Sequence, residues 1–238
     1  MRTDQSTTLE TLSPGGIVLR AKDVRKVYRS GDQDLEVLRG INIELREGET
    51  VAITGASGVG KSTLLHILGA LDRPTEGQLQ IRDVDVLALN DDDRAQFRNR
   101  HVGFVFQFHN LLPEFTALEN VMMPALIARH ADGMESRARD LLSLVGLDHR
   151  LEHRPGELSG GECQRVAVAR ALIMKPELVL ADEPSGNLDY ESSDRLHGLL
   201  RDLASAENQA FLVMTHDRDL AASLDRSGHI DAGRLDLN

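Results

Sequence analysis

The sequence is poor in aromatic side chains, in cysteine and in long apolar runs. It has no tryptophan, two tyrosines and one cysteine, Cys163, among 238 residues. A platform of aromatic rings on which nucleic-acid bases stack is therefore not expected. A single cysteine cannot form a disulfide within the chain, which is compatible with a reducing compartment.

Basic side chains are also fewer than acidic ones. With 27 lysines and arginines against 38 aspartates and glutamates, the formal net charge is −11. Bulk electrostatics then gives no attraction to the phosphates of nucleic acids or to anionic lipid headgroups. We expect no nucleic-acid partner, and we expect any association with a membrane to use a specific docking surface.

No apolar run approaches the roughly 20 residues that cross a bilayer as a helix. The longest candidate, LLHILGAL at 64–71, is short and is interrupted by His66. The opening residues, MRTDQSTTLE, lack the apolar segment of a secretory signal. We therefore expect the chain to stay in the cytoplasm and not to insert into the bilayer.

Apolar periodicity divides the chain into a β-rich opening, a helical middle and a return to alternating strands and helices. Residues 1–14 are polar and end in turn residues, which predicts a flexible tail before one folded domain. The alternation predicts an α/β fold with a parallel sheet covered on both faces. Strands are predicted at 17–28, 41–45, 50–54, 78–82, 102–107, 178–182, 211–216 and 229–235, and helices at 61–71, 91–100, 116–130, 134–146, 159–174 and 192–207.

A glycine-rich loop, GASGVGKS at 55–62, lies between a predicted buried strand and a predicted helix. It matches G-x-x-x-x-G-K-[ST], in which inward-pointing N–H groups and a helix N-terminus hold phosphates. We expect Lys61 to hold the β- and γ-phosphates of ATP and Ser62 to offer its hydroxyl to Mg²⁺. The alternative, a glycine turn with a solvated lysine, is disfavoured by the flanking strand and helix. The nucleotide-binding residues expected here are Gly55, Ala56, Ser57, Gly58, Val59, Gly60, Lys61, Ser62 and Thr63.

The apolar strand LVLAD at 178–182 ends in two adjacent carboxylates, Asp182 and Glu183. Ligands of parallel sheets bind at the carboxyl ends of the strands, where both side chains can approach the phosphates. We expect Asp182 to bind Mg²⁺ through water and Glu183 to orient and deprotonate the attacking water. An acidic pair at a strand end is common, and its combination with the lysine loop favours the functional interpretation.

A second site suited to phosphate is predicted at LSGGECQR, residues 158–165. Ser159 is a typical N-cap, Gly160 and Gly161 leave the backbone bare, and an amphipathic helix follows. An ordinary capped helix is the alternative. One chain thus offers two phosphate-ready helix ends and one lysine loop. Two copies related by a two-fold axis, each giving its SGG helix end to the nucleotide on the other, would use both.

These motifs, in this order, resemble those of the ATPase subunits of ABC transporters over about residues 17–235. The resemblance implies a P-loop NTPase fold of the ABC ATPase type, with a RecA-like parallel-sheet core and an N-terminal antiparallel β subdomain. It also implies an inserted α-helical subdomain. The implied boundaries are about 15–90 and 166–238 for the core with its β subdomain, and about 91–165 for the helical part, all within one domain at 15–238.

The same resemblance assigns roles to further residues. Tyr28 matches the aromatic that stacks on adenine, although a half-buried strand tyrosine is the alternative. Gln107 matches the glutamine that touches Mg²⁺ and water, and Asp189 matches the loop that joins the two sites of the dimer. His216 matches the histidine that contacts the γ-phosphate, although strand-end histidines are often structural. The implied sets are Glu183, His216, Gln107 and Lys61 for catalysis, Ser62, Gln107 and Asp182 for Mg²⁺, and Ser159, Gly160, Gly161 and Glu162 for the γ-phosphate of the opposite protomer.

The segment FQFHNLLPEFTALENVMMPALI, residues 106–127, is similar to the lipoprotein-releasing ATPases of this family, whereas GNLD at 186–189 is shared with macrolide-exporter and cell-division relatives. The resemblance implies a peripheral protein on the cytoplasmic face of the inner (plasma) membrane. Integral membrane permease subunits are expected to dock near Gln107–Phe115. The alternative for three of these residues, Leu111, Leu112 and Phe115, is that they pack within the helical part. The residues expected to line or border the docking groove are Phe108, His109, Leu111, Leu112, Pro113 and Phe115.

Four residues depart from the usual family pattern, and none of them removes a catalytic group. They are Asn110, Cys163, Ser185 and Tyr190. Cys163 falls in the first turn of the predicted signature helix, where the helix dipole could lower the pKa of its thiol. We favour the alternative, a neutral replacement that faces solvent.

Two other classes of function remain to be weighed against a transporter motor. A soluble ABC ATPase acting on nucleic acid or ribosomes usually has two cassettes, a coiled coil or a basic surface, and this chain has one cassette and a net charge of −11. A regulatory module that binds ATP without useful hydrolysis is disfavoured by the presence of Glu183 and His216. We therefore expect an ATP-hydrolysing motor.

Overall fold

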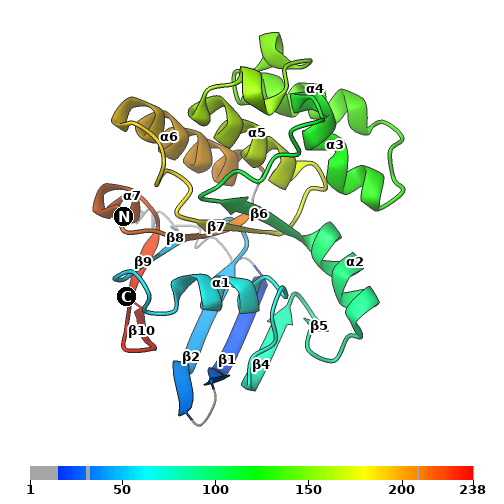
Figure 1. The fold of residues 1–238 in the computed structure, drawn as a ribbon. Helices are drawn as coiled ribbons and strands as arrows, with labels where there is room; N and C mark the ends of the chain where they lie inside the picture. The colour runs from blue at the N-terminus through cyan, green and yellow to red at the C-terminus, as the bar shows by residue number, and fades with distance from the viewer. Residues whose placement is uncertain (1–15, 31–32, 208, 238) are drawn as a thin grey trace, which may run out of the picture.

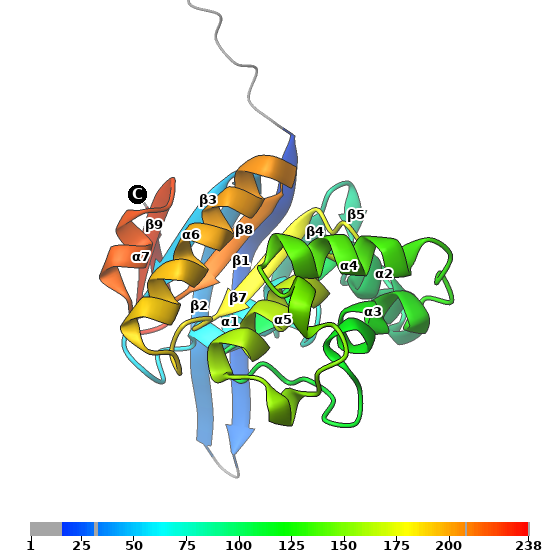
Figure 2. The same cartoon turned by 90° about the horizontal axis from the view of Figure 1, so that it is seen from above.

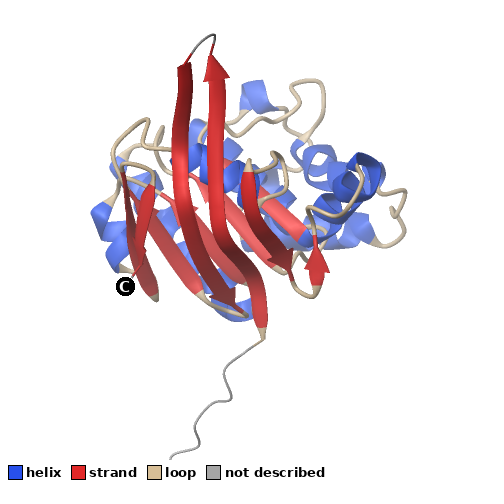
Figure 3. Ribbon diagram, turned by 90° about the horizontal axis from the view of Figure 1, so that it is seen from below, coloured by secondary structure: helices blue, strands red, loops and turns tan. Residues whose placement is uncertain are grey.

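An antiparallel sheet forms one side of the molecule. The computed structural model describes residues 16–30, 33–207 and 209–237, and the predicted tail at 1–14 lies outside them. The sheet has the order β2-β1-β4-β5. Figure 3 shows its two long strands crossing the lower face of the molecule. The strands are β1 (Ile17–Ser30), β2 (Gln33–Arg46), β4 (Glu76–Ile81) and β5 (Val84–Asp85).

A second, six-stranded sheet runs through the middle of the molecule in the order β10-β9-β3-β8-β7-β6. Its strands are parallel except β10, which pairs antiparallel with β9. The carboxyl ends of the parallel strands therefore meet at one edge, where ligands of such sheets bind. The strands are β3 (Thr50–Thr54), β6 (Val102–Phe106), β7 (Leu178–Asp182), β8 (Ala210–Met214), β9 (Arg226–Asp231) and β10 (Arg234–Leu237).

Both faces of the central sheet are buried, which explains why its strands are continuously apolar. On β7, Leu178 and Leu180 belong to the core around α1 (Lys61–Leu68), whereas Val179 and Ala181 belong to the core on the other face. Figure 1 shows α1 between the antiparallel sheet and the six-stranded sheet. The order of layers is thus antiparallel sheet, α1, central sheet and an outer layer of helices.

The outer layer is helical and comes mainly from the middle of the sequence. Figure 2 shows these helices beside and over the parallel strands. Within the described ranges, no helix is both long and apolar enough to cross a membrane. The helices of this layer are α3 (Ala117–Ile127), α4 (Met134–Leu144), α5 (Gly160–Leu172), α6 (Tyr190–Glu207) and α7 (Arg218–Ala222), with short 3-10 turns at Asp148–Arg150 and Pro155–Glu157. The helix α2 (Asp91–His101) precedes the edge strand β6, and its Phe97 packs against the core on the α1 side.

The predicted fold class is confirmed, with differences in individual elements. The strand predicted at 229–235 is wrong as one element: it is the end of β9, a turn and the start of β10. Ala232 and Gly233 have φ of 44° and 76° and make this turn. A Cβ at Gly233 would lie 2.6 Å from the Val37 carbonyl oxygen, so the turn requires glycine there. The short elements α7 and β5 were not predicted.

Candidate functional site

The glycine-rich loop lies at the carboxyl end of β3 and leads directly into α1. Gly55, Gly58 and Gly60 have φ of 157°, 80° and 106°. A Cβ at Gly55 would come within 2.6 Å of the carbonyl oxygen of Ile230 on β9, so the backbone can turn there only without a side chain. The loop therefore holds the shape in which successive N–H groups face one concavity at a helix N-terminus.

Lys61 is the first residue of α1 and is 9% exposed. Its ammonium Nζ donates hydrogen bonds to the carbonyl oxygens of Gly55 at 2.7 Å and Ala56 at 3.2 Å. The side chain thus folds back over the loop, so that its charge lies inside the concavity. Ser62 and Thr63 follow in the first turn, where Ser62 is exposed and Thr63 is half-buried.

Glu183 follows the carboxyl end of β7 and has φ of 46°, a left-handed conformation that is uncommon for a residue with a side chain. Its backbone N–H donates to the carbonyl oxygen of Met214 at 2.8 Å. Its carboxylate Oε1 lies 3.6 Å from Lys61 Nζ. The other oxygen, Oε2, accepts hydrogen bonds from the backbone N–H of His216 at 3.1 Å and lies 2.8 Å from His216 Nδ1.

The structure thus brings together Lys61, Glu183 and His216 from three segments of the chain. The Glu183 side chain is 15% exposed and the His216 side chain is 72% exposed. One carboxylate lies between a buried ammonium and a solvent-facing imidazole. This geometry can hold a water between a carboxylate base and a phosphate bound in the loop.

Gln107 follows β6, the strand next to β7, and Phe106 pairs with Asp182. Its side-chain Nε2 donates to Asn187 Oδ1 at 3.3 Å, and Asn187 Nδ2 donates to the Gln107 carbonyl at 3.1 Å. This reciprocal pair fixes the loop after β7 against the end of β6. Asn187 is not among the predicted site residues, and the GNLD motif is the only sequence signal at this position.

The oxygen donors predicted for Mg²⁺ are a hydroxyl of Ser62, the amide of Gln107 and the carboxylate of Asp182. Asp182 and Gln107 lie at the ends of adjacent paired strands, and Ser62 is exposed in the first turn of α1. Within the described part of the chain, no group of three or more His, Cys, Asp or Glu could hold a metal by itself. Few protein oxygens, completed by water and phosphate, suit Mg²⁺, so these residues fit that ion.

The predicted signature segment begins α5. Ser159 is its N-cap: Ser159 Oγ accepts from Glu162 N–H at 3.2 Å, and Glu162 Oε2 accepts from Ser159 N–H at 2.7 Å. The Ser159 hydrogen bond and the charge of Arg150, 3.1 Å away, lower the pKa of Glu162 against the opposing effect of burial. The Glu162 carboxylate is therefore occupied by the cap, and Gly160 presents open backbone.

The structure does not bring the signature segment to the glycine-rich loop of the same chain. Among the described residues, no hydrogen bond or ion pair connects 159–162 with 55–63. Asp189 lies just before α6, and its carboxylate accepts from Ser192 N–H at 3.0 Å and from Ser192 Oγ at 2.7 Å. These bonds lower the pKa of Asp189. One chain therefore contains two separate places with bare backbone at a helix start.

Tyr28 is 42% exposed on β1. Its hydroxyl donates to Asp72 Oδ2 at 3.4 Å, and Lys26 Nζ lies 5.0 Å from the ring centroid. Burial is the largest single influence on the pKa of Asp72 and raises it, but the hydrogen bonds from Lys26 and from the Arg73 N–H, the charge of Lys26 and the Tyr28 hydrogen bond together hold that pKa below its ordinary value. The ring stands at the surface with a cation on one face.

Cys163 was predicted either as a reactive thiol or as a residue facing solvent, and both interpretations are wrong. The side chain is 3% exposed and belongs to the core on the helical side of the central sheet. Its Sγ donates to the Pro155 carbonyl at 3.6 Å. Burial, and then the negative charge of Glu162, raise the pKa of the thiol. The first turn of α5 therefore contributes the side chain of Cys163 to the hydrophobic core.

The loop after Gln107 is partly exposed. Phe108 is 70% exposed, whereas Leu111 is 8% exposed and packs in the core, so Leu111 does not line a surface groove. Asn120 holds this loop: its Nδ2 donates to the carbonyls of Leu112 and Phe115 at 3.1 and 3.0 Å. Burial, and then the charge of Arg170, lower the pKa of His109. Leu112, Pro113 and Phe115 are exposed.

The layered fold, the glycine-rich loop and the acidic strand end define a P-loop ATPase. Residues 38–186 match the sequence profile of the ABC transporter family. The chain is 55% identical to the lipoprotein-releasing system ATP-binding protein LolD of Cytophaga hutchinsonii, over 88% of this chain and 94% of that one. It is 53% identical to the protein of the same name from Geobacter metallireducens, over 92% and 97%.

Solved structures agree with the sequence relatives. A bacterial ABC transporter cassette, described as dimeric, superposes with a TM-score of 0.85 at 38% identity, over 92% of this chain and 96% of the other. A dimeric cassette in a post-hydrolysis state bound to ADP and Pi gives 0.84 at 37% identity, with the same coverage. The chain belongs to the ATP-binding subunits of ABC transporters and is an ABC-type ATP hydrolase.

Proposed function

We propose that the chain is the motor subunit of a lipoprotein-releasing complex, which uses ATP to extract lipoproteins from the inner membrane toward the outer membrane. The observation that carries this proposal is the identity of 55% and 53%, over nearly full length, to proteins named for lipoprotein release. Its membrane partners are permease subunits of the LolC/LolE type. The chain then works as a peripheral protein on the cytoplasmic face of the inner membrane.

The active form is a homodimer with two nucleotides between the protomers. The separation of residues 159–162 from the glycine-rich loop within one chain supports this arrangement, because a second copy can supply the missing backbone. Ser159, Gly160 and Gly161 of one protomer then face the γ-phosphate held by the other, and Asp189 lies at the junction. Glu162 acts by holding the N-cap, which keeps the start of α5 rigid.

The residues of the loop and the strand ends divide the work of hydrolysis. Lys61 leaves the carbonyls of Gly55 and Ala56 and binds the β- and γ-phosphates of ATP. The Glu183 carboxylate is then no longer paired with the Lys61 ammonium. Glu183 takes the proton of the attacking water, and His216 holds both that carboxylate and the γ-phosphate. Ser62, Gln107 and Asp182 would hold Mg²⁺, which would supply positive charge to offset the charge of the phosphate oxygens.

Binding and hydrolysis alternate between two states of the dimer. Closure around ATP moves the helical part, about residues 91–165, and pushes on the permeases through the segment 107–115. Hydrolysis and release of products reopen the interface. Tyr28 stacks on the adenine, for which its exposed ring on β1 is suited.

A reconstituted system tests the proposal. The chain is combined with its LolC/LolE-type permeases in proteoliposomes loaded with a labelled outer-membrane lipoprotein, and released lipoprotein is measured. We expect release that requires ATP and Mg²⁺ and is absent with a non-hydrolysable analogue. ATP turnover without any release of lipoprotein, in a complex shown to be assembled, would contradict the proposed cargo.

A further inference from the structure

A histidine and a serine form a buried polar pair beside the carboxyl end of β7. His197 lies on α6, and Ser185 lies in the turn that follows Glu183. Nε2 of His197 is 3.0 Å from Oγ of Ser185, and the two residues are 8% and 9% exposed. A buried polar group without a partner is costly, so each side chain depends on the other. The pair therefore connects α6 to the turn that carries Glu183.

The turn after β7 transmits the position of Ser185 to Glu183. Glu183 has φ of 46°, a left-handed conformation that persists only where its surroundings hold it. The Gly186 N–H donates to the Glu183 carbonyl, and the Leu188 N–H donates to the Ser185 carbonyl, both at 3.0 Å. These two bonds close overlapping turns around Ser185. A shift of Ser185 therefore moves the backbone of Glu183 as well.

The helix α6 gives this contact a firm support. Leu200, Leu203 and Ala204 are 1–2% exposed and belong to the core on the helical side of the central sheet. His197 precedes Leu200 by three residues and Ala204 by seven, so it lies on the same buried face of the helix. The imidazole is thus placed by a packed helix, and it can hold the serine of a less regular segment.

The imidazole of His197 is neutral at neutral pH. Burial is the largest influence on the pKa of His197 and lowers it below its ordinary value. The carboxylates of Asp217, Asp194 and Asp219 oppose this effect, and the guanidinium of Arg201 adds to it. A neutral imidazole has one donor and one acceptor nitrogen, and a serine hydroxyl can take either role. The contact with Ser185 therefore forms without a charge.

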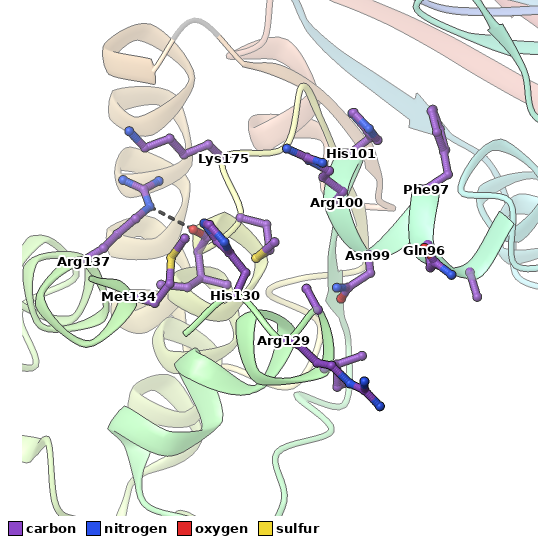
Figure 4. Close-up of a pocket in the computed structure, with 15 residues that line it drawn as sticks. Gln96, Phe97, Asn99, Arg100, His101, Arg129, His130, Met134, Arg137 and Lys175 are labelled. Carbon is purple, nitrogen blue, oxygen red and sulfur yellow. Dashed lines mark hydrogen bonds between the residues drawn. The ribbon is translucent and has the colours of Figure 1, made fainter. Parts of the chain in front are cut away.

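The pair is closed to ligands. The cavity drawn in Figure 4 has a volume of about 1020 Å³ and is lined by residues such as Phe97, Arg137 and Lys175, and not by His197 or Ser185. Both members of the pair are buried and bonded to each other. They have no free group to offer to a bound molecule, so an effect on the reaction must pass through the turn that carries Glu183.

We propose that His197 is a positioning residue for ATP hydrolysis, which holds the turn of Glu183 through its hydrogen bond to Ser185. His216 contacts the Glu183 carboxylate itself, whereas His197 fixes the backbone from which that carboxylate projects. A misplacement of a reacting group by about 1 Å costs about a hundredfold in rate. This inference rests on the proposed role of Glu183 as the base.

Steady-state hydrolysis of ATP by the full chain tests the proposal. His197→Phe keeps a buried ring without a hydrogen-bonding nitrogen, and Ser185→Ala removes the hydroxyl. We expect each change to lower kcat about tenfold to a hundredfold and to leave KM and the affinity for ATP within about twofold. The double variant should be no slower than the slower single variant, because both changes remove one contact. His149→Phe, at an exposed histidine, should keep the wild-type kcat.

Conservative replacements separate positioning from packing. His197→Gln keeps a hydrogen-bonding group near the place of Nε2, and Ser185→Thr keeps the hydroxyl, so both should recover most of the lost kcat. A merely structural role would lower the stability to urea and leave the kcat of the folded fraction unchanged. The stoichiometry of ATP binding counts that fraction. Ser185→Ala, the smaller change, decides the test if His197→Phe does not bind ATP.

Three results would overturn the proposal: an unchanged kcat in the folded single variants, losses that add in the double variant, or His197→Gln as slow as His197→Phe. Glu183→Gln provides the remaining comparison. Its residual turnover should not fall further when His197→Phe is added, and a further fall would show that His197 does not act through Glu183. Hydrolysis at the wild-type rate in Glu183→Gln alone would instead reject the proposed base, so the two failures are distinguishable.

Discussion

The carboxylate of Glu183 lies 2.8 Å from Nδ1 of His216 and also accepts the backbone N–H of that residue at 3.1 Å. The backbone N–H and the imidazole of His216 thus both contact Oε2 of Glu183. The other carboxylate oxygen, Oε1, lies 3.6 Å from Lys61 Nζ. The proposed base is thus oriented by a histidine on the neighbouring strand end and lies near the lysine of the glycine-rich loop. The orientation of the Glu183 carboxylate is therefore fixed by contacts within the fold.

Glu183→Gln should abolish turnover while leaving nucleotide binding intact. Glutamine keeps the shape and can still pair with His216 but cannot take a proton from water, so hydrolysis should fall by about 10²–10⁴-fold. Phosphate release measures turnover, and gel filtration with ATP should show a trapped dimer. Glu152→Gln, at an exposed glutamate, is the matched control. Hydrolysis at the wild-type rate in Glu183→Gln would remove Glu183 as the base.

Lys61→Ala should weaken the binding of ATP itself. Lys61 is 9% exposed, and a charge-assisted contact with phosphate is strong in such a setting, so we expect a loss of about tenfold to a hundredfold in affinity. Equilibrium binding of a fluorescent ATP analogue gives the value. Lys22→Ala changes an exposed lysine on β1 and should bind ATP as the wild type does. Unchanged affinity in Lys61→Ala would contradict the phosphate site.

Asn120→Ala should destabilise the segment between Gln107 and α3. The side chain is 1% exposed, and its amide also accepts from Leu112 N–H at 2.8 Å through Oδ1. Its removal takes the Asn120 partner from the Leu112 N–H and from the Phe115 carbonyl in a partly buried setting, which costs about 2–3 kcal/mol in the free energy of unfolding. Urea unfolding measures this cost. Ser136→Ala, at an exposed position of α4, should change stability little, and an equal effect of both variants would contradict the structural role of Asn120.

His197 should make the folded state sensitive to mild acid. Its Nε2 lies 3.0 Å from Ser185 Oγ in a buried pair, and burial lowers the pKa of His197 more than the neighbouring charge of Asp217 raises it. An unfolded chain therefore takes up the proton at a higher pH than the folded chain does. The stability that the neutral histidine contributes is present above its ordinary pKa of 6.5 and is lost as the pH falls below that value.

The pH dependence of the melting temperature checks this expectation. Between about pH 8 and about pH 5.5 the melting temperature of the wild type should fall, and His197→Gln should reduce the slope. His109, whose pKa is also lowered, contributes with the same sign, so part of the slope remains. His149→Gln, at an exposed histidine, should keep the wild-type slope. A slope unchanged by His197→Gln would contradict the buried role of His197.

Much of the fold could be predicted because its elements are marked by strong local signals. The central strands β3 and β7 are short apolar runs that end at glycines or carboxylates, and α5 begins at a Ser159–Glu162 capping box. The periodicity of apolar residues and the residues that cap a helix are local properties, so both can be recognised from the sequence alone. The short strand β5, of two residues, has no such signal and depends on its pairing with β4.

The features that sequence reasoning missed depend on tertiary contacts. Cys163 stands in the first turn of α5, where a solvent-facing position is common, and only the packing of the helical layer shows that it is buried. Asn187 became a partner of Gln107 because two strand ends meet in the parallel sheet.

The most direct test of the account is the sorting of lipoproteins in the native cell after expression of Glu183→Gln. Inner and outer membranes are separated, and outer-membrane lipoproteins are quantified in each fraction. A trapped motor in a lipoprotein-releasing complex should leave these lipoproteins in the inner membrane, whereas Glu152→Gln should not. Normal sorting, in cells where the trapped complex is confirmed to form, would contradict lipoprotein release as the work that this ATPase performs.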